Sequence, residues 1–313
     1  MGDVVQSLGA VQSLITARPE LELHFVTQSG NAPLLEGLGL ASVISHDREG
    51  GIRGLLRTRR KLRAVSPEVA VDLQGNWKSA LIARCSGASE CIGAAGRHRQ
   101  EPSSSVLLRR RVAIDGPGHP FATALQLLRE LEPNLDAVAP RLEATTVELD
   151  HARDTLREAG LDPESPFTVF VVTNPRDNRA WHLAAMTRQV VLEDRPVIWL
   201  CGPREQGIHL PADAITVRHG PDRLRELIAL GTLVRDAGGR VLGPDQGGIH
   251  VLAATGAEVA VLYGPQDPQR TAPPGARVLV KNPGPDCVPC RKRTCSHAAG
   301  PICMDFTTSE SSG

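Results

Sequence analysis

A short glycine-containing segment in the last third of the chain has the residue types of a phosphate-binding turn. It reads Asp-Gln-Gly-Gly-Ile-His over residues 245–250, between an apolar stretch and a helix-like one. Gly247 and Gly248 would let the backbone come close to a ligand, and the N–H groups that begin a helix favour an anion. His250, one turn further, would add a donor or a positive charge. The simpler alternative is a tight turn in which Asp245 caps the helix, but the combination favours ligand binding.

A second polar loop follows the apolar stretch FTVFVVTN. It begins at Thr173 and contains Arg176 and Arg179, whose guanidinium groups could reach a phosphate. Glu205, after the next apolar stretch, is a candidate acceptor of hydrogen bonds from sugar hydroxyls. The alternative for each is an ordinary solvated side chain, because charged loop residues are mostly exposed. Together with segment 245–250 they predict an anionic ligand on this half of the chain.

Four of the seven cysteines lie near the end of the chain with the spacing C-x2-C-x4-C-x7-C. Such spacing is typical of metal ligands, and four thiolates would complete a closed tetrahedral zinc site. The residues are Cys287, Cys290, Cys295 and Cys303. An iron–sulfur cluster and a reduced, metal-free segment are the alternatives. The pattern predicts a structural zinc ion and gives these cysteines no part in catalysis.

Composition excludes several classes of partner. Lys+Arg and Asp+Glu both number 35, so no global field draws the protein to nucleic acid. The sequence shows neither an apolar run of membrane-spanning length nor a secretion leader, which favours a cytoplasmic protein. A length of 313 residues favours two domains.

Helical and strand-like stretches alternate along the chain, which predicts α/β domains with parallel sheets. One series occupies residues 1–148 and a second occupies residues 149–313. Each strand-like stretch of the second series ends in Gly, Pro, Asn or Asp, where a doubly wound sheet places its ligand loops. We expect two such domains to form a cleft between their carboxyl-edge loops.

Several motifs occur in the order in which one enzyme family carries them. They are MGDVVQSLGAV, VDLQGNWKSALIA, PDQGGIH, YGPQDPQRTAPPG and the cysteine-rich end. In these segments the chain resembles glycosyltransferase family 9, the ADP-heptose:lipopolysaccharide heptosyltransferases, whose donor domain carries an Asp-Ser-Gly-x-x-His signature. The resemblance implies a GT-B fold, with two Rossmann-like domains facing each other across a cleft. It also implies inverting transfer of a heptose, or a related sugar, from an ADP-sugar donor to a lipopolysaccharide core acceptor.

The resemblance implies roles for particular residues. Asp3 would take the proton of the acceptor hydroxyl, Arg179 stands where the family has a donor-contacting Lys, and Glu205 falls near the ribose contact. Residues 1–148 would bind the acceptor and residues 149–313 the donor. The anionic acceptor would bind basic side chains of the first domain, which would otherwise form a solvated face or contact the inner surface of the inner membrane. These side chains are Arg57, Arg60, Lys61 and Lys78. Because no Asp-x-Asp triplet occurs, catalysis is expected to need no metal or other cofactor.

The chain departs from the family pattern in three places. No strand precedes the Gly2-Asp3 pair, so we expect either that the true start lies upstream and Met1 is an internal methionine, or that the first sheet lacks its first, central strand. Gln246 replaces the usual Ser, and no helix follows the terminal segment MDFTTSESSG. Two alternatives to the transferase stay open on this sequence. One is a truncated, inactive scaffold that binds nucleotide or metal, and the other is a GT-B-like nucleotide-sugar epimerase or hydrolase, which would need further carboxylates.

Overall fold

The computed structural model describes residues 1–47, 49–219 and 223–312. The chain divides into two compact units, one spanning residues 3–140 and the other residues 141–313. The expected division between residues 148 and 149 falls inside a helix, α5 (Thr146–Glu158), which belongs as a whole to the second unit.

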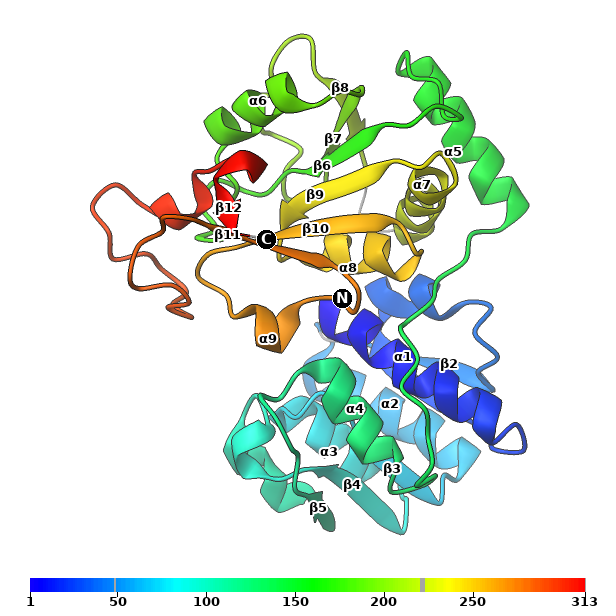
Figure 1. Ribbon diagram of the computed structural model, residues 1–313. Coiled ribbons are helices and arrows are strands. Elements are labelled where there is room, and N and C mark those ends of the chain that lie inside the picture. Colours follow the sequence, from blue (N-terminus) through cyan, green and yellow to red (C-terminus); the bar gives the residue numbers. More distant parts are fainter. Residues whose placement is uncertain (48, 220–222, 313) are drawn as a thin grey trace. The chain divides into compact units, whose positions relative to one another are not determined.

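The first unit alternates helices with short strands (Figure 1). In chain order its longer elements are α1 (Gly2–Ala17), β1 (His24–Gln28), η1 (Ser29–Leu35), β2 (Ser42–His46), α2 (Gly51–Val65), β3 (Val69–Asp72), α3 (Trp77–Cys85), β4 (Glu90–Ala94), η3 (Pro102–Leu107), β5 (Arg110–Val112) and α4 (Pro120–Leu128). All strand pairs are parallel, as β1 with β2 and as the ladder β3-β4-β5. Within the described residues these are two separate sheets with no strand pair joining them.

The core of the first unit lies between α1 and α4. Ala10, Val11 and Leu14 project from α1 and pack with Ala124 and Leu128 of α4 in one buried cluster. The i, i+3, i+4 spacing of such side chains is what makes one stripe of a helix apolar. Burial of this stripe holds α1 in place and therefore fixes its first turn, which carries Asp3.

The second unit is built on one large sheet. Its elements are α5, β6 (Thr168–Val171), α6 (Leu183–Leu192), β7 (Val197–Cys201), β8 (Ile215–Arg218), α7 (Leu224–Asp236), β9 (Arg240–Pro244), α8 (Gly247–Ala254), β10 (Glu258–Tyr263), α9 (Pro268–Thr271), β11 (Arg277–Lys281) and β12 (Ser311–Ser312). The strand order is β12-β11-β10-β9-β6-β7-β8, and among the described strands only β12 is antiparallel to its neighbour. The order reverses direction between β9 and β6, and in doubly wound sheets the carboxyl ends of the strands at such a point bind the ligand.

Buried aromatic and aliphatic side chains fill the space beside this sheet. Phe170 of β6 lies against Trp181 and Trp199, with ring centroids 5.0 and 5.9 Å apart, respectively. Trp181 is only 2% exposed and belongs to this core. The alternating α/β pattern expected from the sequence is confirmed in both units.

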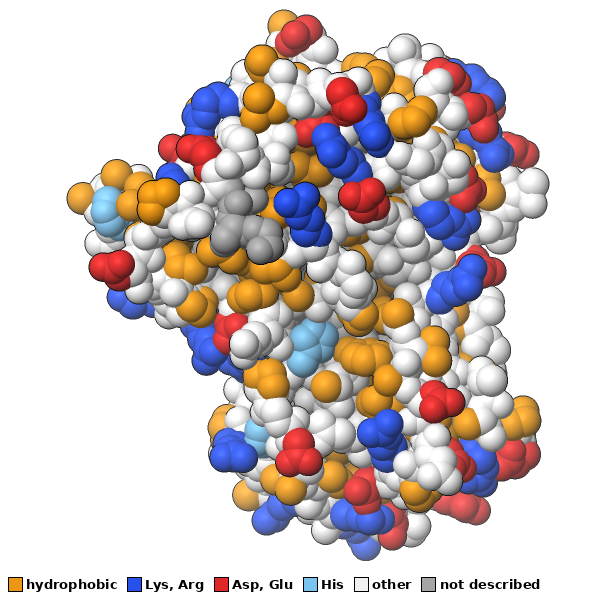
Figure 2. Space-filling model, viewed as in Figure 1, with side chains coloured by type: hydrophobic (Ala, Val, Ile, Leu, Met, Phe, Trp, Pro, Cys, Tyr) orange, Lys and Arg blue, Asp and Glu red, His pale blue; other side chains and the backbone are white. Residues whose placement is uncertain are grey.

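The face drawn in Figure 2 carries no dominant charge. On this face, acidic and basic side chains are intermingled, as equal numbers of the two predict. None of the helices within the described residues has the length and apolar character needed to cross a membrane.

Helix α5 begins with a charged cap that ties it to α7. Thr145 accepts from the Glu148 backbone N–H, and the Glu148 carboxylate accepts from the Thr145 N–H at 2.7 Å. Arg225 donates to both oxygens of the same carboxylate, at 2.7 and 2.8 Å. These bonds, led by those from Arg225, lower the pKa of Glu148 from 4.5 to about 2.

Replacing Glu148 by Gln should destabilise the second unit by about 2 kcal/mol at pH 7, because Gln keeps the cap but leaves Arg225 without its anion. A depressed folded-state pKa stabilises the native state above the unfolded pKa of 4.5, and this contribution disappears as the pH falls through about 2. Urea unfolding of the two proteins should therefore converge between pH 5 and pH 2. Glu158→Gln, at the exposed end of the same helix, is the control and should be nearly neutral. If the free energies of unfolding of wild type and Glu148→Gln differed by the same amount across this pH range, the stabilising role of the ionised Glu148 carboxylate would be contradicted.

Candidate functional site

Asp245 and His250 form a buried pair at the start of α8. His250 Nε2 lies 3.0 Å from Asp245 Oδ1, and their side chains are 5% and 8% exposed, respectively. The N-cap of α8 is Gln246, which makes no capping side-chain bond, so the alternative in which Asp245 caps the helix is wrong. Asp245 instead orients His250 from the carboxyl end of β9. A Cβ added at Gly248 would meet only Leu227, at 3.7 Å, so packing does not require glycine there.

Arg179 lies beside this pair, in the loop after β6. Its Nη1 donates to the Asp245 carbonyl oxygen at 3.0 Å, while Nε and Nη2 donate to Asp177 at 2.9 and 2.7 Å. These side-chain bonds lower the pKa of Asp177 and raise the pKa of Arg179. The guanidinium group is therefore held in a fixed position by two acceptors. With its side chain 33% exposed, it still has a face open to a ligand.

Thr173 and Glu205 complete the carboxyl edge of the strands. The Thr173 side chain is 3% exposed, and its Oγ1 has no hydrogen-bond partner within the described part of the chain. Such an orphaned hydroxyl costs free energy unless a ligand or water pairs with it. Glu205 is 8% exposed and accepts from the Asn174 backbone N–H at 3.1 Å, so it joins two neighbouring loops. Arg176, by contrast, is exposed.

The segment after β11 supports these loops from behind. Asn178 donates to the Lys292 carbonyl oxygen, and Trp181 Nε1 donates to the Phe306 carbonyl oxygen at 3.0 Å. Arg291 pairs with Asp267 of the loop that precedes α9. The loop that carries Arg179 is thus tied on both sides of Arg179 to the end of the chain.

The zinc prediction is not supported. Within residues 1–47, 49–219 and 223–312, no group of three or more His, Cys, Asp or Glu side chains is arranged to hold a metal ion. Cys303 is buried in the apolar core of the second unit, and burial, followed by the charges of the other three cysteines, raises the pKa of its thiol to about 11. Cys287 is exposed, and all four cysteines are free thiols. A buried thiol of high pKa favours packing over metal binding. The structure therefore gives the four predicted ligands, Cys287, Cys290, Cys295 and Cys303, no metal site.

Asp3 stands on the first turn of α1 in the first unit. It is exposed, and its Oδ2 accepts a hydrogen bond from Gln100 Nε2 at 2.9 Å. The N-cap of α1 is Met1, so Asp3 does not cap this helix. A carboxylate in a first turn is stabilised by the helix dipole.

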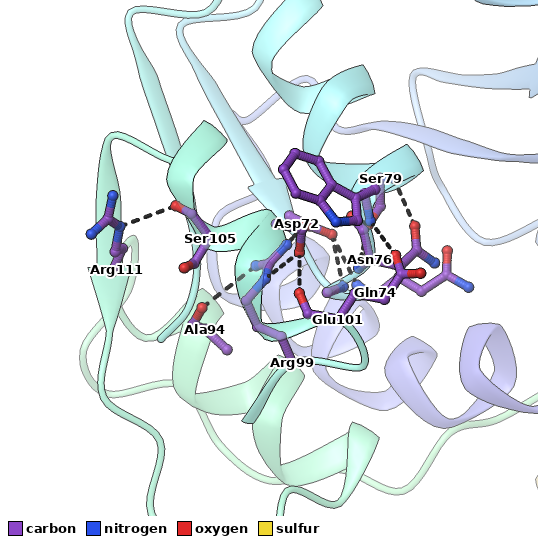
Figure 3. A network of polar contacts seen from close by, with 12 residues as sticks. Asp72, Gln74, Asn76, Ser79, Ala94, Arg99, Glu101, Ser105 and Arg111 are labelled. Atoms are coloured by element: carbon purple, nitrogen blue, oxygen red, sulfur yellow. Dashed lines mark hydrogen bonds and ion pairs between the residues drawn. The ribbon is translucent and has the colours of Figure 1, made fainter. Parts of the chain in front are cut away.

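A buried ion pair fixes the chain that carries Gln100 (Figure 3). Arg99 Nη2 lies 2.5 Å from Asp72 Oδ2, and both side chains are fully buried. Arg99 also donates to Ser104 Oγ at 2.9 Å, and the other Asp72 oxygen accepts the backbone N–H groups of Gln74 and Gly75. Loss of one partner from such a pair costs about 3–5 kcal/mol. The segment around Arg99 is therefore rigidly attached to the end of β3.

Four predicted acceptor-binding cations are all exposed in the first unit. They are Arg57, Arg60, Lys61 and Lys78. Arg57 lies 3.7 Å from Asp47, and no ion pair occupies the other three within the described residues. His46 lies close to two of the elements that carry these cations. Its Nδ1 is 2.9 Å from Thr58 Oγ1 of α2, and burial followed by the charge of Lys78 lowers its pKa. The structure therefore brings Lys78 of α3 near the basic helix α2.

Sequence reasoning missed Asp177 and Gln100. Asp177 is two residues from Arg179, and the pattern Arg-Asp-Asn-Arg could have suggested a local ion pair. Gln100 is 97 positions from Asp3, and a single glutamine in a polar loop carries no signal of such a contact.

Comparison with known proteins agrees with this architecture. Residues 55–299 match the model of "Glycosyltransferase family 9 (heptosyltransferase)". Lipopolysaccharide heptosyltransferase 1 of Pseudomonas aeruginosa is 25% identical over 95% of this chain and 85% of its own length. The crystal structure of a family 9 glycosyltransferase from Veillonella parvula gives a TM-score of 0.75 at 17% identity, over 88% of this chain and 81% of that one. The E. coli heptosyltransferase WaaC, solved with ADP, gives 0.64 at 20% identity over 89% and 87% of the two chains.

The solved structures confirm the GT-B class of fold, and the family match covers well over half of the chain. The motif order and the matched family model indicate the same family. The chain belongs to glycosyltransferase family 9 and is a glycosyltransferase.

Proposed function

We propose that the protein transfers a heptose, or a related sugar, from an ADP-sugar to a lipopolysaccharide core, with inversion at the anomeric carbon. The observation that carries the proposal is the group formed by the Asp245–His250 pair, Arg179 and the orphaned hydroxyl of Thr173. It offers the Arg179 cation, the start of α8 and the unpaired Thr173 hydroxyl at the carboxyl ends of β6 and β9, where the strand order reverses. The names of the relatives add support, since one is a lipopolysaccharide heptosyltransferase and WaaC was solved with ADP.

The second unit would hold the donor and stabilise the leaving group. When the bond between the anomeric carbon and the phosphate oxygen breaks, ADP departs with the bonding electron pair. Arg179 and the N–H groups of Gly247 and Gly248 would stabilise the added negative charge. Asp177 and the Asp245 carbonyl hold Arg179 in place before the reaction, so little reorganisation is needed as charge develops. Glu205 would accept from a sugar hydroxyl, and Arg176 would contribute a more loosely held charge.

The first unit would bind the acceptor and activate it. Asp3 would take the proton of the acceptor hydroxyl while its oxygen forms the new bond to the anomeric carbon. Arg57, Arg60, Lys61 and Lys78 would attract the phosphates of the core. Exposed Ile52 and Leu56 accompany this charge on α2, which favours contact with the inner face of the inner membrane in the cytoplasm.

Asp3→Asn should lower transfer by about 10²- to 10⁴-fold, because the amide cannot accept the proton. Binding of ADP, measured by calorimetry, should not change, since the donor residues lie in the other unit. The assay follows ADP release from ADP-heptose with and without a lipopolysaccharide core acceptor. Normal transfer by the variant would show that Asp3 is not the base. A wild-type protein that binds ADP but transfers nothing would favour the scaffold, and conversion without acceptor would favour an epimerase or hydrolase.

Arg179→Ala should lower kcat about 10²-fold and weaken ADP binding, because it removes the charge that faces the leaving phosphate. Arg179→Lys should keep part of the activity, since a point charge replaces the fork held by Asp177. Arg157→Gln, an exposed arginine of α5, is the control. An Arg179→Ala enzyme with normal kcat and normal ADP affinity would rule out this role.

The double variant Arg60→Gln/Lys61→Gln should raise the acceptor KM about tenfold at low salt and leave kcat at saturating acceptor unchanged. The difference from wild type should shrink as NaCl is raised toward 0.5 M, because salt screens exposed charges. Arg153→Gln/Arg157→Gln removes as much charge from α5 and should leave the acceptor KM unchanged. Equal effects of the two pairs would show that α2 has no specific part in acceptor binding.

A further inference from the structure

We infer that Gln100 is a positioning residue for the Asp3 carboxylate. The inference deepens the proposed function, since it rests on Asp3 as the base. A carboxylate only accepts hydrogen bonds, so the amide nitrogen of Gln100 is the group that faces Asp3 Oδ2, at 2.9 Å. The bond occupies one carboxylate oxygen and leaves Oδ1 for the proton of the acceptor hydroxyl.

Asp3 needs such a partner because its side chain is exposed. It is exposed on the first turn of α1, and Gln100 provides the side-chain hydrogen bond that the structure records for it. An exposed carboxylate without a partner samples several rotamers, and a base must lie within hydrogen-bond reach of the proton that it removes. A single donor of fixed position would select one orientation.

Gln100 can act as a fixed donor because both of its neighbours are anchored. Arg99 is locked by its buried pair with Asp72 (Figure 3). Glu101 donates its backbone N–H to the Gly75 carbonyl at 3.1 Å, and its carboxylate accepts the Trp77 N–H at 2.6 Å. The backbone of Gln100 is thus held from both sides, although its side chain is exposed.

Gly93 packs closely against this anchor. A Cβ added at Gly93 would come within 2.9 Å of Arg99 Nη1 and 2.8 Å of a Leu108 methyl. Gly75, which receives the Glu101 N–H, has a φ of +76°, a conformation that glycine adopts without strain. The sheet β3-β4-β5 therefore fixes the backbone that carries the Gln100 amide. The Gln100 side chain in turn contacts Asp3 of α1.

The test is a series of substitutions graded by donor capacity. Gln100→Leu removes the donor at similar size, Gln100→Glu puts a like charge beside Asp3, and Gln100→Arg restores a donor. We expect kcat to fall about tenfold in Gln100→Leu and further in Gln100→Glu, and to recover largely in Gln100→Arg. The KM for the ADP-sugar should not change. A merely structural role would instead make Leu and Arg equally harmful, which would overturn the inference.

Gln126→Leu is the matched control, because Gln126 is a half-buried glutamine of the same unit whose two hydrogen bonds go to the backbone of Asp115. It should leave kcat unchanged. A second readout does not need activity: the ¹³C chemical shift of the Asp3 side-chain carboxylate at neutral pH should change in Gln100→Leu and stay constant in Gln126→Leu. An unchanged shift in Gln100→Leu would overturn the inference. Normal transfer by Asp3→Asn would overturn the proposed base instead, so the two failures are distinguishable.

Discussion

The buried ion pair between Asp72 and Arg99 is the constraint on which the first unit depends. Two fully buried charges are tolerated only when each is paired and its remaining polar atoms are satisfied. Asp72 meets this condition with backbone N–H groups, and Arg99 with the Ser104 hydroxyl. The pair therefore fixes the turn after β3, the start of α3 and the segment that reaches Asp3.

The second unit uses a buried carboxylate in a similar way. Asp245 follows β9 as Asp72 ends β3, and each holds a cationic or titratable partner from another part of its own unit. The surroundings of Asp245 are less buried and less fully hydrogen-bonded than those of Asp72. Arg179 keeps an exposed face, and the Thr173 hydroxyl has no partner within the described residues. The first carboxylate serves architecture, whereas the second lies where the proposed donor would bind.

The sequence predicted the α/β units and the family, because apolar periodicity and ordered motifs are local signals. It also placed Asp245, Arg179 and Thr173 correctly on loops at the carboxyl edge of one sheet. It could not predict the contact of Gln100 with Asp3 or the pairing of Asp72 with Arg99, since these depend on tertiary packing over long separations. The zinc expectation is not supported by the described residues, because regular spacing brings cysteines near each other along the chain but does not by itself arrange their thiols around an ion.

The loop that carries Arg179 is attached to the segment after β11 by hydrogen bonds whose acceptors are main-chain carbonyl oxygens. Asn178 and Trp181 both donate to carbonyl oxygens, those of Lys292 and Phe306. Every amino acid offers the same carbonyl, so the exposed side chain of Lys292 is free to vary during evolution while the tie persists. Phe306 lacks this freedom because its ring is fully buried. Among related sequences, many residue types should therefore occur at position 292 and few at position 306.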